Sequence, residues 1–140
     1  MYRRLIILVA IVSLGLPVAP GLATGSSVTF AGKTSQKRKV TFRATATSVR
    51  SFFFQTRFVC SGRSGFVTRA RFARIPRHGR RFSAAFAASN GAVRTTITGR
   101  ISGRHASGTI RRRATFNAAR KLDRSGRLVC RSSVRWTARR

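Results

Sequence analysis

From residue 40 onward, apolar and polar residues alternate with a period of two, the pattern of strands that bury one face. Val40, Phe42 and Ala44 would face a core, and Thr41 and Arg43 would face solvent. The same alternation recurs along the chain and predicts a series of strands. They cover residues 40–46, 52–60, 66–72, 82–88, 93–101, 110–116 and 128–136.

Turn-forming residues separate these segments. Asn90-Gly91 is the sharpest signal, because both residues tolerate the positive φ that a type I′ hairpin requires. A two-residue loop there would pair Ala88 with Val93 and Phe82 with Gly99, and it would keep the inward residues of both strands on one face. The other turn signals are residues 61–65, 76–79, 103–105 and 123–126.

Three residues within the predicted strands carry specific expectations. Arg112 interrupts an apolar set and predicts a bulge or a strand end. Phe53 lies between the inward Phe52 and Phe54, so it would point outward, either to stack on a sugar or base or to join a second core layer. Trp136 belongs to an inward set and is expected in the core.

Cys60 and Cys130 both fall on predicted inward faces. Two cysteines in an exported domain most simply form a disulfide, with free thiols as the alternative. The bridge would close a loop of about 70 residues and contribute roughly 4 kcal/mol by chain entropy. By joining the second predicted strand to the last, it favours an all-β fold: a single antiparallel β-barrel or two-layer β-sandwich of about seven strands, mostly a meander.

The N-terminus has the pattern of a secretory signal peptide. Arg3 and Arg4 precede an apolar run over residues 5–16, and cleavage is expected after Ala23. The alternative is a retained membrane anchor. The expected organisation is a signal-peptide helix over 1–23, a basic N-terminal arm or edge strand over 24–39 and a β-domain over 40–140. The protein would then be secreted or associated with the cell envelope.

The charge balance is extreme. The chain has 30 Lys and Arg residues against one acidic residue, Asp123, and removal of Arg3 and Arg4 would lower its formal charge only from +29 to +27. Guanidinium groups bind phosphates and carboxylates, so the expected partner is a polyanion. The candidate residues lie at outward strand positions. They are Arg43, Arg57, Arg69, Arg71, Arg94, Arg100, Arg111, Arg113, Arg131 and Arg135.

The same composition argues against catalysis. Asp123 is the only carboxylate side chain and lies in a predicted turn, and His78 and His105 lie in predicted loops. No pattern indicates a catalytic residue, a metal site or a cofactor.

The sequence therefore predicts a non-catalytic exported domain that associates with anionic wall polymers, acidic lipids or extracellular DNA, without sequence-specific nucleic-acid recognition. The alternative function is a secreted cationic effector that binds nucleic acid or anionic membranes. A third interpretation treats the charge as compositional bias combined with solubility.

Several short motifs resemble small uncharacterised exported β-proteins of GC-rich actinobacteria. They are residues 33–36 (KTSQ), 60–62 (CSG), 79–82 (GRRF), 106–109 (ASGT) and the ending 130–139 (CRSSVRWTAR). The resemblance spans most of the mature chain. It implies a secreted β-domain with a single disulfide, and it assigns no activity and no functional residues.

Overall fold

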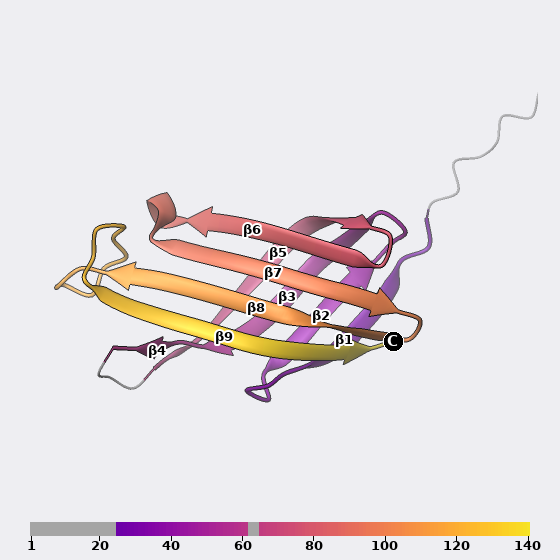
Figure 1. The fold of residues 1–140 in the computed structure, drawn as a ribbon, viewed down its shortest axis with the longest axis horizontal. Helices are drawn as coiled ribbons and strands as arrows, with labels where there is room; N and C mark the ends of the chain where they lie inside the picture. The colour runs from indigo at the N-terminus through magenta and orange to yellow at the C-terminus, as the bar shows by residue number, and fades with distance from the viewer. Residues whose placement is uncertain (1–24, 62–64) are drawn as a thin grey trace, which may run out of the picture.

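The computed structural model describes residues 25–61 and 65–140, and these fold into an antiparallel β-barrel (Figure 1). Eight strands pair side by side, and the first also pairs with the last, which closes the barrel. The strands are β1 (Val28–Thr34), β2 (Lys39–Ala44), β3 (Ser48–Arg57), β4 (Val59–Cys60), β5 (Val67–His78), β6 (Arg81–Ala88), β7 (Val93–Ser102), β8 (His105–Phe116) and β9 (Leu128–Arg139), with one 3-10 turn, η1 (Ser89–Gly91).

The order around the barrel is β1-β2-β3-β5-β6-β7-β8-β9, and the short β4 pairs separately with β9. The predicted all-β fold class is thus confirmed, and of the two expected architectures the structure is the barrel. The predicted signal peptide over 1–23, including its helix, and turn residues 62–64 lie outside the described residues.

The barrel is flattened into two layers (Figure 1). Strands β6 to β9 form one layer, and β1, β2, β3 and β5 form the other. One seam is the β1–β9 ladder, whereas β5 and β6 share only two backbone pairs beside their hairpin turn. Farther along this second seam, the Phe72 and Phe86 rings stack with centroids 3.8 Å apart. Side chains therefore close part of the β5–β6 seam.

The N-terminal segment differs from its prediction as an arm or edge strand. Over Val28–Thr34 it is β1, which pairs with β2 on one side and with β9 on the other. Phe30 is buried and stacks on Phe42 with centroids 5.0 Å apart. A Cβ on Gly32 would lie 1.9 Å from the backbone oxygen of Thr137, so glycine permits the close approach of β1 to β9. The β-domain accordingly begins before residue 40 and contains eight barrel strands instead of about seven.

The β6–β7 hairpin has the register that the sequence predicts. Ala88 pairs with Val93, and Phe82 pairs with Gly99. At the turn, Asn90 has φ 53° and ψ 33°, the left-handed conformation expected of a type I′ turn. A Cβ on Gly99 would lie 2.2 Å from the Phe82 ring, so the ring covers the glycine across the strand pair.

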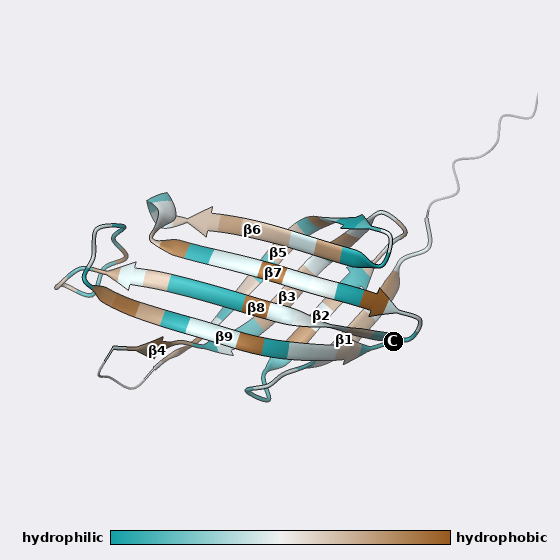
Figure 2. Cartoon of the chain, viewed as in Figure 1, coloured by the Kyte–Doolittle hydropathy of each residue, from teal (hydrophilic) through white to brown (hydrophobic). Residues whose placement is uncertain are grey.

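Aromatic side chains fill most of the barrel. Trp136 is buried as predicted, and its ring lies 5.6 to 6.1 Å from those of Phe42, Phe52 and Phe82. Buried and exposed residues alternate along most of β7, β8 and β9, as expected for strands of a barrel wall with one face toward the core. Figure 2 shows hydrophobic and hydrophilic stretches interspersed along the same strands. Phe66, expected inward, is instead 40% exposed because it precedes the start of β5.

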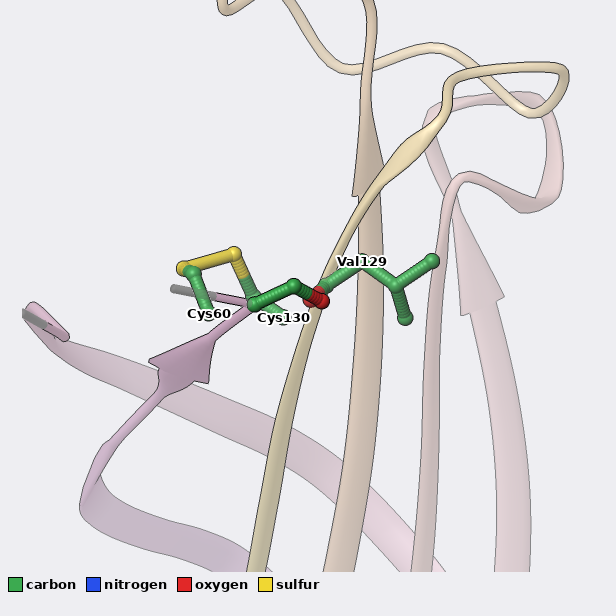
Figure 3. The surroundings of a disulfide bond; sticks show 4 residues. Cys60, Val129 and Cys130 are labelled. Carbon is green, nitrogen blue, oxygen red and sulfur yellow. A yellow bond between two sulfur atoms is a disulfide. The ribbon is translucent and has the colours of Figure 1, made fainter. Parts of the chain in front are cut away.

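The disulfide forms a second, smaller core cluster. Cys60 and Cys130 are direct cross-strand partners on β4 and β9, and they form the predicted bridge (Figure 3). Both are buried, and they pack with Phe58 and Ala114. The chain thus leaves β3, crosses to β9 and is fixed there covalently.

Candidate functional site

All ten predicted anion-binding arginines are exposed, but they do not form one field. The two layers of the barrel divide them between two outward faces. Strands β7, β8 and β9 carry Arg94, Arg100, Arg111, Arg113, Arg131 and Arg135, while β2, β3 and β5 carry Arg43, Arg57, Arg69 and Arg71. The sequence predicted the outward positions correctly but not this separation, because the barrel curvature comes from distant strand pairings.

The β7–β9 face contains a continuous row of guanidinium groups. Arg94 pairs with Arg113, which pairs with Arg131, so three arginines lie on adjacent strands. Paired residues of antiparallel strands have Cα atoms about 4.5 to 5.5 Å apart, so the backbone positions of neighbouring arginines in the row are closer than a Debye length of about 8 Å. Arg124, from the loop after β8, joins Arg94 and Arg113 around a surface hollow of about 140 Å³.

The rest of the β7–β9 face consists of hydrogen-bonding groups. Every exposed residue of these three strands is Arg, Ser, Thr or His. The Thr98 and Thr109 hydroxyls, on neighbouring strands, lie 2.8 Å apart and hydrogen bond. The face therefore offers guanidinium groups for anions and hydroxyl groups for polar neighbours of those anions.

The outward face of β2, β3 and β5 combines arginines with an aromatic side chain. It carries its own arginine row, in which Arg43 pairs with Arg50 and Arg50 with Arg74. Arg50 and Arg74 were not among the predicted residues, because strict alternation from Phe52 and Phe72 would turn them inward. The alternation shifts at Ser51 on β3, which has a φ of 50°, and at Ala73 and Arg74 on β5, where two consecutive residues are exposed. Phe53 points outward as predicted, is half-buried, and has the Arg71 guanidinium 5.6 Å from its ring centre.

Arg112, which was not among the predicted anion-binding residues, has a different environment from the exposed arginines. The predicted bulge or strand end is wrong, since β8 pairs continuously with β7 and β9 through this residue. Its side chain points into the barrel, where Nε donates to Thr95 Oγ1 at 3.3 Å and Nη1 donates to Thr56 Oγ1 at 3.4 Å and to Thr68 Oγ1. The only sequence signal for this inward position is its spacing, because Arg112 lies two residues from the inward Ile110 and two from the inward Ala114.

Aromatic rings complete the surroundings of Arg112. Its guanidinium carbon lies 5.3 Å from the Phe54 ring centre and 4.9 Å from that of Phe58. Burial lowers the pKa of the Arg112 guanidinium, although arginine remains protonated in proteins. A positive charge is therefore held inside the barrel by hydroxyl groups and ring faces.

The remaining polar candidates have local roles. Asp123 Oδ1 accepts hydrogen bonds from the Ser125 backbone N–H at 2.9 Å and from its hydroxyl at 2.8 Å, and these lower the pKa of the Asp123 carboxyl. The turn over 123–126 is confirmed. His78 and His105 are exposed at strand ends beside hairpin turns. Within 25–61 and 65–140, no three His, Cys, Asp or Glu side chains gather as metal ligands, and no helix has the length and hydropathy of a membrane span.

Comparison of the chain with protein-family models, curated proteins and solved structures finds no match.

Proposed function

We propose that this protein is an exported, non-catalytic β-barrel that associates with an anionic polymer of the cell envelope through the outward face of β7, β8 and β9. The supporting observation is the row of Arg94, Arg113 and Arg131 on a face whose exposed residues are all Arg, Ser, Thr or His. Export is inferred from the signal-peptide pattern and from the disulfide, which persists in oxidising compartments.

This face suits a polymer that combines charged and hydroxyl groups. Guanidinium groups bind phosphate or carboxylate oxygens through two parallel hydrogen bonds, and Ser and Thr hydroxyls hydrogen bond to polyol or sugar oxygens. A wall polymer with phosphate or carboxylate groups along a polyol or sugar backbone has both. Asp123, the single carboxylate side chain of the protein, hydrogen bonds to Ser125 in its own turn, and its one negative charge is far outnumbered by the arginines of this face.

A second function is supported by the disulfide end of the barrel. Val59, Phe66, Val67 and Leu122 are exposed there, and Phe66 contacts Phe116, which in turn bridges to Leu122. An apolar surface beside arginines is what a cationic effector of anionic membranes requires. Insertion of these side chains into anionic vesicles would distinguish this function from polymer binding.

The test is binding of the mature, oxidised protein to purified cell wall, duplex DNA and anionic vesicles over a salt series. The proposal predicts the tightest binding to cell wall and a steep loss of affinity with salt, because binding releases counterions. Equal and weak binding to all three partners at physiological salt would contradict it. Leakage of anionic vesicles at concentrations where wall binding is absent would support the effector function instead.

A further inference from the structure

The barrel interior contains a layer of polar side chains between its two apolar clusters. Thr95, Arg112 and Ser132 are direct cross-strand neighbours on β7, β8 and β9. Thr56 on β3 and Thr68 on β5 bond to the same guanidinium from the opposite layer. The polar layer therefore crosses the barrel from one sheet to the other.

The charge of Arg112 has no counter-charge among the described side chains. Its hydrogen-bond acceptors are the neutral hydroxyls of Thr56, Thr68 and Thr95, and these engage Nε and Nη1. Within 25–61 and 65–140, no acceptor bonds to its Nη2. Asp123, the only acidic side chain, lies in the turn after β8 and is bonded to Ser125. The Nη2 group of Arg112 therefore has N–H donors that are free to bind an anion.

Ser132 supplies a second, independent donor in this layer. The residue is only 5% exposed, and its Oγ has no hydrogen-bond partner among the described residues. Buried hydroxyls in folded proteins nearly always have a partner. Ser132 is the direct cross-strand neighbour of Arg112, and both side chains point to the inner side of the barrel wall, so an anion bound at one of them lies next to the other.

We propose that this polar layer is a binding site for a small monovalent anion of about the size of chloride, held between Arg112 Nη2 and the Ser132 hydroxyl. Aromatic and disulfide clusters fill the barrel on either side, which excludes a polymer. The +29 formal charge of the chain raises the local concentration of anions. Arg112 and Thr68 are half-buried, and β5 lacks backbone pairing with β6 at this level, so the β5–β6 seam gives the anion a route from solvent.

The test is thermal unfolding at fixed ionic strength while chloride replaces a bulky sulfonate. The wild-type protein and an Arg113→Gln variant, which loses the same charge from the outer surface, should gain stability that saturates with chloride. Arg112→Gln should show no saturable gain, and Ser132→Ala should need a chloride concentration about tenfold higher for half of the effect. Absence of a chloride-specific gain in the wild-type protein, or an equal gain in Arg112→Gln, would overturn the proposal.

A direct measurement on the wild-type protein covers the case in which the Arg112 variant does not fold. In crystals grown in bromide, the anomalous signal should place a bromide ion within hydrogen-bond reach of Arg112 Nη2 and Ser132 Oγ. A bromide-free polar layer at a bromide concentration that saturates the stability effect would refute the site. Stabilisation by phosphate but not by chloride would refute the assignment to a small monovalent anion.

Discussion

Arg112 and Arg113 are consecutive on β8, yet their guanidinium groups lie on opposite sides of the barrel wall. Arg112 hydrogen bonds to threonines inside the barrel, whereas Arg113 lies on the surface beside Arg94 and Arg124. Strand alternation alone produces this difference, since neighbouring side chains point to opposite faces. Two residues of the same type therefore have different physical roles, and they form a matched pair for experiments.

Replacement of Arg112 by alanine should lower the free energy of unfolding by about 2 to 4 kcal/mol, because it removes ring contacts and leaves a cavity among unpaired threonine hydroxyls. Replacement of Arg113 by alanine should change it by less than about 0.5 kcal/mol, because that side chain is exposed. Urea unfolding at moderate salt measures both values. Similar losses for the two variants would show that the interior contacts of Arg112 contribute little.

Loss of the Cys60–Cys130 disulfide should strongly lower the free energy of unfolding. The bridge closes a loop with a sequence separation of 70 residues, and its removal by Cys60→Ser with Cys130→Ser should cost roughly 4 kcal/mol. The measurement is denaturant unfolding of the oxidised wild-type protein against the double variant. Mass mapping without reductant should find the two cysteines joined, and free thiols in exported protein would contradict the structure.

The stability contributed by Asp123 should be lost only at low pH. The hydrogen bonds from Ser125 lower the pKa of Asp123 in the folded state, so the stability it contributes is present above its unfolded pKa, about 3.9, and is lost as pH falls through the lower folded value. Because the chain has no other carboxylate side chain, the melting temperature should change little from this source between neutral pH and about pH 4.

Asp123→Asn is the matched control for this titration. Asparagine preserves the side-chain acceptor of the turn but does not ionise, so its melting temperature should lack the part of the decline that wild-type protein shows below about pH 4. Melting temperatures from neutral pH to about pH 2 at constant ionic strength measure the difference. An identical decline in both proteins would assign the acid sensitivity to the C-terminal carboxylate or to another group.

The sequence was informative wherever local rules decide the structure. Period-two alternation located the strands from β2 onward, and the Asn90-Gly91 turn set the β6–β7 register. The alternation did not reveal β1, because Gly32 and Thr34 occupy inward positions but are not apolar residues. Their burial depends on pairing with the distant β9. Arg112 was misplaced for a related reason: partners on β3, β5 and β7 compensate a polar residue in the core, and no local pattern reveals them.

Barrel closure explains why the separation of the outward arginines into two groups was not predicted. A single sheet would put every outward arginine on one face, and only the β1–β9 pairing, between the two ends of the domain, turns that sheet into two opposed faces. The ten candidate residues were therefore predictable as exposed, but their separation into two groups was not.

The proposed binding of an anionic polymer by the β7–β9 face is tested most directly by two charge-matched triple variants. Arg94→Gln, Arg113→Gln and Arg131→Gln remove the row on that face; Arg43→Gln, Arg50→Gln and Arg74→Gln remove the row on the opposite face. The measurement is the affinity of each variant and of wild-type protein for purified cell wall over a salt series. Loss of the β7–β9 row should weaken binding at least about tenfold and reduce the salt slope by about 2 to 3, as expected for three lost ionic contacts, whereas loss of the opposite row should do markedly less. Equal weakening by both triple variants would show that net charge alone governs the association, and would contradict a defined binding face.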